Sequence, residues 1–226
     1  SGAMPLLVEG RIIPEGTLTG ELVFARGSSR FSGRKNPDAA LPDPNGLTYL
    51  KEGYGGLHFT FPDLNGKPVS LKDAKYRDKV VIVTLMGSWC PNCVDETAFL
   101  APWYRQNRHR GVEIIGLAFE RKDDPAYAKY ILGKLIRRFD VQYDILFAGP
   151  ASKDAASQAL PALSKVLAFP TTILIDRKGN VQRIHTGYTG PATGKYYEEF
   201  VRAFNEDVDR LLNNEPLPVA ARHAEK

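Results

Sequence analysis

The only two cysteines of this 226-residue chain lie in the segment Trp89-Cys90-Pro91-Asn92-Cys93. Because they are three positions apart, they cannot join distant parts of a fold, and their role must be a local one. Such a pair either binds a metal or cycles between dithiol and disulfide. A structural zinc site needs about four ligands. The four histidines are scattered along the chain, so the supply of ligands argues against a metal.

Disulfide exchange requires a thiolate, whereas a free cysteine with a pKa of about 8.5 is mostly protonated at neutral pH. The apolar run 80–86 predicts a strand, and Pro91 suits the first position of a helix. Cys90 should therefore lie at a helix N-terminus, where unpaired N–H groups can stabilise a negative sulfur. Cys93 follows one turn later on nearly the same face. We expect Cys90 to attack a substrate disulfide and Cys93 to resolve the mixed disulfide.

The elements around this pair predict an α/β protein with a central mixed β-sheet flanked by helices. The strand 80–86, a helix from Pro91 to about 109 and the strand 112–119 form a β-α-β unit, which makes a parallel strand pair. An added N-terminal β-hairpin is expected at 57–71, with Asn65-Gly66 as a type I′ turn. The remaining predicted elements are a helix at 125–139, a strand at 144–147, a helix at 155–167, an antiparallel hairpin of 171–175 with 181–185, and a helix at 194–212.

Residues 1–56 hold ten of the 20 glycines, and this composition predicts a loop-rich N-terminal extension. Short strands are expected near 6–8, 12–13 and 21–24, followed by an irregular connector at 27–56. We expect the main domain at 57–213 and a C-terminal tail at 214–226. Residues 1–4 are typical of a cloning remnant, which leaves the native start, and any signal or anchor, open.

The charge pattern gives no reason to expect a nucleic-acid partner. The 30 Lys and Arg residues against 26 Asp and Glu leave a net charge of +4, spread along the chain. No segment approaches the roughly 18 consecutive apolar residues of a membrane-spanning helix. With 43% hydrophobic residues, the chain can bury a full core.

The strand before Trp-Cys-x-x-Cys, together with the later Phe169-Pro170-Thr171-Thr172, resembles the thioredoxin superfamily over residues 57–213. Within it, the segments 62–71 and 184–191 and the acidic Glu96 look like the TlpA and ResA group of extracytoplasmic thiol-disulfide oxidoreductases. The resemblance implies a thioredoxin-like fold and a place in the periplasm or cell envelope. It also implies disulfide-containing protein substrates, an upstream thiol reductant, and neither a cofactor nor a metal.

The resemblance also assigns substrate-binding residues. Pro170 matches a cis-proline that faces the cysteine pair, although only about 5–6% of X-Pro bonds are cis in folded proteins. Its neighbours Phe169 and Thr171 would line the peptide groove, while a core phenylalanine and an ordinary strand threonine are equally open interpretations. Trp89 would shield the reactive sulfur, and Pro91 would lie beside it.

Glu96 matches the acidic residue that moves protons at the buried cysteine in that family. Burial would raise its pKa and suit it to this task, whereas a carboxylate interacting with the helix dipole is the simpler alternative. His185 could approach the site from a neighbouring strand, although a lone strand histidine is usually structural. Where members of the group often carry a proline, this chain has Ala98, and Pro102 follows later.

Two other functions stay open at this point. A thiol peroxidase of the peroxiredoxin type shares the fold, but its reactive cysteine normally lacks a partner in a C-x-x-C. A non-catalytic thioredoxin-fold binding module usually lacks one of the two cysteines. The direction of electron transfer is also open, because the dipeptide between the cysteines tunes the reduction potential.

Overall fold

The structure is a computed structural model, and it describes residues 7–14, 16–24, 27–39 and 42–218. The chain divides into two compact units, Ser1–Leu41 and Pro42–Lys226. Each unit is described by itself. The expected cloning remnant at 1–4 lies outside the described residues.

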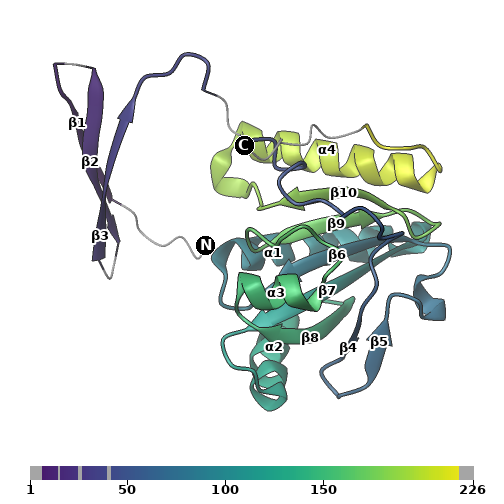
Figure 1. Cartoon of the computed structure of the whole chain (residues 1–226). Helices are drawn as coiled ribbons and strands as arrows, with labels where there is room; N and C mark the ends of the chain where they lie inside the picture. The colour runs from purple at the N-terminus through teal and green to yellow at the C-terminus, as the bar shows by residue number, and fades with distance from the viewer. Residues whose placement is uncertain (1–6, 15, 25–26, 40–41, 219–226) are drawn as a thin grey trace. The chain divides into compact units, whose positions relative to one another are not determined.

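The first unit is an antiparallel sheet in the order β1-β2-β3, formed by Leu7–Ile12, Thr17–Phe24 and Gly27–Arg34 (Figure 1). The strand β3 corrects the expectation of an irregular connector from residue 27. Gly20 pairs with Gly10 on one side and with Phe31 on the other. A Cβ atom at Gly20 would lie 2.7 Å from Cζ of Phe31. The glycine therefore makes room for the aromatic ring across the sheet.

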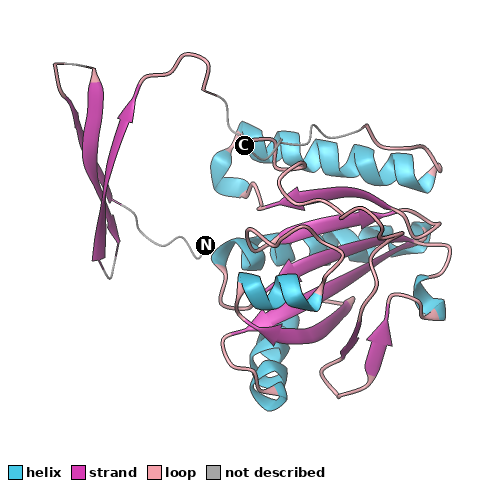
Figure 2. Ribbon diagram, in the orientation of Figure 1, coloured by secondary structure: helices cyan, strands magenta, loops and turns pink. Residues whose placement is uncertain are grey.

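The second unit contains a five-stranded sheet in the order β10-β9-β6-β7-β8. Figure 2 shows the strands of this unit in magenta and its helices in cyan. Strands β6, β7 and β8 are parallel, while β9 is antiparallel to β6 and β10 is antiparallel to β9. The predicted mixed sheet is confirmed. Its strands are β6 at Val80–Met86, β7 at Val112–Glu120, β8 at Asp144–Pro150, β9 at Thr171–Ile175 and β10 at Val181–Thr186.

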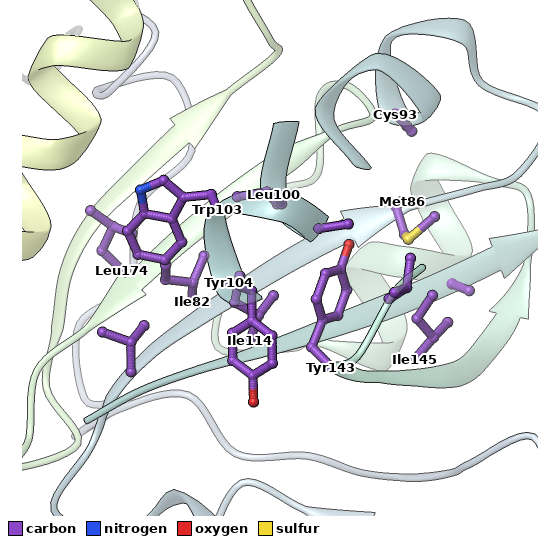
Figure 3. Packing of buried hydrophobic residues seen from close by; sticks show 14 of the residues in the cluster. Ile82, Met86, Cys93, Leu100, Trp103, Tyr104, Ile114, Tyr143, Ile145 and Leu174 are labelled. Atoms are coloured by element: carbon purple, nitrogen blue, oxygen red, sulfur yellow. The ribbon is translucent and has the colours of Figure 1, made fainter. Parts of the chain in front are cut away.

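Helices cover both faces of this sheet. Helices α1 (Pro91–Asn107), α2 (Pro125–Phe139) and α4 (Lys195–Leu212) pack in the hydrophobic cluster that contains Cys93. Figure 3 shows part of this cluster, with Cys93, Leu100 and Trp103 of α1 among the labelled residues. Helix α3 (Lys153–Ala159) and the segment around Leu57 pack on the other face. Short 3-10 helices occur at Ala74–Tyr76, Arg108–Arg110 and Pro191–Thr193. No described helix is long and apolar enough to span a membrane.

Two predicted elements differ from the observed ones. Helix α3 ends at Ala159 instead of reaching residue 167, because the residue before Pro161 disfavours helical geometry. The expected hairpin is present as β4 (Thr60–Pro62) and β5 (Pro68–Ser70), but its turn is not type I′. Only Gly66 has a positive φ, 82°, and the Asp63 carboxylate accepts hydrogen bonds from two backbone N–H groups of the turn.

The second unit begins earlier than the expected domain boundary at residue 57. The carbonyl of Pro44 accepts a hydrogen bond from the N–H of Thr186 at 2.9 Å, and Lys51 donates its N–H to the carbonyl of Ala162, also at 2.9 Å. Part of the predicted extension therefore packs along β10 and the segment that leads to β9.

Candidate active site

The two thiols lie where the fully buried strand β6 gives way to helix α1. Cys90 is the N-cap residue of α1, and its Sγ accepts a hydrogen bond from the N–H of Cys93 at 3.3 Å. Both cysteines are free thiols. Cys90 is 6% exposed and Cys93 is 0% exposed. Only the Cys90 thiol is therefore accessible for reaction with another molecule.

The surroundings of the two sulfurs separate their pKa values. The hydrogen bond from the Cys93 thiol is the largest influence lowering the pKa of Cys90, and backbone N–H groups of the first helical turn add to it, against burial. Burial raises the pKa of Cys93, and the hydrogen bond to Cys90 raises it further. Ionisation of the pair is therefore favoured at Cys90, the outer sulfur, and disfavoured at Cys93.

Glu96 lies on α1 one turn beyond Cys93, and its side chain is enclosed by the core. The residue is 3% exposed. Its two carboxylate oxygens accept hydrogen bonds from the hydroxyls of Thr84 and Thr172, both at 2.6 Å. Burial raises the pKa of Glu96 to about 7, and the two hydroxyls oppose that shift. Both protonation states are therefore populated near neutral pH, so this carboxyl group can accept and release a proton.

The segment around Pro170 faces the cysteine pair. The Phe169–Pro170 peptide bond is cis, and the carbonyl of Phe169 accepts a hydrogen bond from the Cys90 thiol at 3.4 Å. The Trp89 ring packs edge-on against Phe169, with ring centroids 5.8 Å apart. Pro91 is the first residue of α1 and is partly buried. The fold thus places four residues that were predicted from the sequence around the Cys90 sulfur: Trp89, Pro91, Phe169 and Pro170.

Thr171 does not join them. Its side chain is 0% exposed, and its hydroxyl donates to the carbonyl of Ala168 at 2.9 Å. Its position in β9 pairs with Leu85 on one side and Thr186 on the other. This threonine is therefore an internal residue of the sheet, and its side chain does not line a surface groove.

Four residues that hold the site in place were not predicted from the sequence. Thr84 and Thr172 position Glu96, as described above. Glu120, the last residue of β7, accepts hydrogen bonds from both the N–H and the hydroxyl of Ser88, at 2.7 and 2.8 Å. This carboxylate fixes the turn that precedes Cys90. Thr84 and Glu120 each interrupt or end an apolar run, and that signal could have revealed them.

The polar and ring contacts that the structure defines for His185 do not involve either cysteine. Its Nδ1 lies 2.9 Å from Oδ1 of Asn45, and its ring packs against Phe200. Burial lowers its pKa to about 4, so it is neutral at neutral pH. Among the described residues, no group of three or more His, Cys, Asp or Glu side chains is arranged to hold a metal ion.

A mixed sheet, vicinal thiols at a helix N-terminus and a cis-proline opposite them define a thioredoxin-fold thiol-disulfide oxidoreductase. The sequence profile of the redoxin family matches residues 37–199, and the chain belongs to that family. The chain is 30% identical over 146 residues to the thiol-disulfide oxidoreductase ResA of Bacillus thuringiensis subsp. konkukian. The aligned region covers 64% of this chain and 73% of that relative. ResA of Bacillus subtilis is 28% identical over 142 residues, with coverage of 63% and 71%.

Solved structures show the same fold. A thioredoxin-family thiol:disulfide interchange protein from Chlorobium tepidum TLS superposes with a TM-score of 0.51 and 21% identity, over 77% of this chain and 99% of that one. A DsbF homologue from Corynebacterium diphtheriae has a TM-score of 0.50 and 18% identity, over 76% of this chain and 96% of that one. The predicted thioredoxin-like fold, and the resemblance to the ResA and TlpA group, are confirmed.

Proposed function

We propose that this protein reduces disulfide bonds in partner proteins outside the cytoplasm, with Cys90 as the attacking thiolate and Cys93 as the resolving thiol. The observation that carries the proposal is the difference between the two cysteines: Cys90 is 6% exposed and has a lowered pKa, whereas Cys93 is 0% exposed and has a raised pKa. A dithiol mechanism needs both properties.

In the first step, the Cys90 thiolate attacks one sulfur of the substrate disulfide. A bond forms between Cys90 and that sulfur, the substrate S–S bond breaks, and one substrate thiolate leaves. The partly exposed rings of Trp89 and Phe169 beside Cys90 offer an apolar surface to the substrate peptide. Pro170 holds this segment opposite the sulfur.

In the second step, the Cys93 thiol gives its proton to the Glu96 carboxylate and its sulfur attacks Cys90. The mixed disulfide breaks, and the second substrate thiolate leaves. Two electrons have passed to the substrate, and the protein now holds the Cys90–Cys93 disulfide. Glu96 suits the role of base because its pKa of about 7 leaves a large carboxylate fraction at neutral pH.

The cycle requires a thiol reductant that reopens the Cys90–Cys93 disulfide. We infer an upstream electron donor in the cell envelope, because substrate disulfides persist in oxidising compartments. The similarity to proteins named ResA supports this location. The substrates we infer are proteins that contain disulfides.

The two single cysteine variants separate the two steps. Cys90→Ser should abolish reduction of a model disulfide such as insulin, because no attacking thiolate remains. Cys93→Ser should accumulate a covalent mixed disulfide with the substrate, visible by mass spectrometry of the intact protein. Turnover by Cys90→Ser would contradict the assignment, as would a Cys93→Ser protein that traps nothing.

The same preparation tests the alternatives. A thiol peroxidase would consume hydrogen peroxide with excess thiol faster than it reduces insulin. The position of Cys93 directly behind Cys90 favours disulfide exchange instead. A binding module would keep its full affinity for partner proteins in a Cys90→Ala and Cys93→Ala double variant, whereas a reductase should lose the covalent complex.

A further inference from the structure

A cavity of about 480 Å³ is lined by helix α4, the edge strand β10 and its neighbour β9, with Pro44 and Asn45 from the segment before β4. Thr172 forms part of its wall, although this residue is only 6% exposed. Since a water molecule takes up roughly 30 Å³ in the liquid, the space has room for on the order of ten waters. The cavity can therefore bring solvent as far as Thr172.

The two hydroxyls that bind Glu96 differ in what lies behind them. Thr84 is on the central strand β6 between β7 and β9, and it is 2% exposed. Thr172 is on β9 and borders the cavity. Each hydroxyl oxygen lies 2.6 Å from one carboxylate oxygen. A proton on Glu96 is thus one hydroxyl group from the cavity through Thr172.

We propose that Thr172 relays the Glu96 proton into the cavity below α4 and so resets the base between turnovers. The inference rests on the proposed function, in which Glu96 receives the proton of Cys93. The protonated carboxyl group donates to Oγ1 of Thr172 while the threonine hydroxyl gives its own proton to cavity water. The threonine retains the proton that it received from Glu96, which already points at the carboxylate, and its hydroxyl turns towards the cavity again only after Glu96 is next protonated. No electron moves, and Thr172 acts as a positioning residue for Glu96.

The charges along this route favour the passage of a proton. The guanidinium of Arg183 is paired with Asp207 at 2.8 Å, so these two charges offset each other in the cavity wall. His185 is neutral, because burial lowers its pKa to about 4. The carboxylate of Glu199 also lines the cavity. The wall therefore presents a net negative charge to a departing proton.

The other titratable groups near Glu96 cannot take this proton at neutral pH. Burial raises the pKa values of Cys93, Tyr143 and Tyr188, so the two phenols stay protonated throughout the cycle. Cys90 is bonded to Cys93 once the resolving step is complete. Of the surroundings of Glu96, the water-accessible cavity is thus the one that can accept its proton.

The test follows thiolate release and proton release in one stopped-flow experiment on the reduced full-length protein. Ellman's disulfide serves as the substrate, because its aromatic thiolates absorb visible light and do not take up protons. A pH indicator in weak buffer reports the proton, at a pH about two units above the Glu96 pKa of about 7. In the wild type, one proton should appear together with the second thiolate. In Thr172→Val, it should lag at least fivefold behind.

Three matched variants separate a relay from a structural effect. Thr84→Val also removes one 2.6 Å hydrogen bond to Glu96, yet it should show no lag. Thr172→Ser keeps the hydroxyl and should restore simultaneous release. Ala203→Trp alters an exposed residue of the cavity wall and leaves both threonines intact, so it should reproduce the lag even if Thr172→Val fails to fold.

The outcomes distinguish this proposal from the function on which it rests. A wild-type protein that releases no thiolate would refute the proposed function. A wild type that releases thiolate normally, with equal lags in Thr172→Val and Thr84→Val, would overturn the relay and leave the oxidoreductase chemistry standing. Simultaneous release in both Thr172→Val and Ala203→Trp would also overturn it.

Discussion

The buried carboxyl group of Glu96 should make the stability of the protein depend on pH. Its pKa of about 7 in the folded chain exceeds the ordinary value of 4.5, so the folded state binds the proton more tightly than the unfolded state. The stability that Glu96 contributes is therefore full below pH 4.5 and is lost as pH rises through about 7. The loss is at most roughly 3 kcal/mol.

A Glu96→Gln variant tests this at residue scale. Because glutamine has no proton to lose in this range, the free energy of unfolding of the variant relative to the wild type should rise by up to roughly 3 kcal/mol between pH 4.5 and pH 8. Urea denaturation of the reduced proteins at several pH values measures the difference. A constant difference across that range would show that Glu96 is ionised normally.

Some residues of the site could be predicted from the sequence, and others could not. The spacing of Cys90 and Cys93 and the proline after Cys90 were enough to predict the reactive pair and its place at a helix start. The enclosure of Glu96 was not predictable from its neighbours in the chain. The hydroxyls of Thr84 and Thr172 come from two other strands, and only the pairing of those strands brings them to one carboxylate.

At the scale of elements, the turn between β6 and α1 determines how the reactive sulfur is presented. The indole N–H of Trp89 donates to the carbonyl of Phe119 at 2.8 Å, and the ring lies across Gly87. A Cβ atom at Gly87 would lie 2.4 Å from Nε1 of Trp89 and 2.7 Å from the carbonyl oxygen of Phe119. No side chain fits there unless the tryptophan or the strand moves.

Gly87→Ala should therefore weaken both the fold and the reaction. Overpacking of this kind costs about 1–3 kcal/mol, and displacement of Trp89 should slow insulin reduction. Gly133→Ala in helix α2 is a suitable control, because its nearest neighbour would be the flexible end of Arg137 at 3.4 Å. Thermal unfolding and initial rates of the two variants provide the comparison. Equal behaviour would mean that the turn tolerates a side chain.

Elements with a strong local signal were predicted well, and the exceptions have physical causes. The continuous apolar runs of β6 and β7 and the helix α2 at Pro125–Phe139 matched the expected ranges closely. The strand β3 was missed because Gly27–Arg34 is rich in glycine and serine and has one apolar residue, Phe31. Its strand conformation depends on pairing with β2, which no pattern within the segment reveals.

At the scale of the whole molecule, the residues that form the redox centre all belong to the unit Pro42–Lys226. The sequence placed the start of this domain at residue 57, because 42–56 has no periodic pattern. Those residues nevertheless make long-range hydrogen bonds, including those of Thr48 and Tyr49 to the segment before β9. Backbone groups of an irregular segment can pair with a distant loop, and such pairing leaves no mark in composition.

Two truncations test where the independent redox domain begins. Removal of residues 1–41 should leave the rate of insulin reduction within about twofold and the unfolding midpoint nearly unchanged, because no residue of the site or of its described hydrogen bonds is lost. Removal of residues 1–56 deletes several backbone and side-chain hydrogen bonds, among them those of Pro44, Thr48 and Lys51. At about 1 kcal/mol each, their loss should lower the midpoint by on the order of 10 °C. If the shorter truncation alone abolished folding or activity, the first unit would be an essential part of the enzyme.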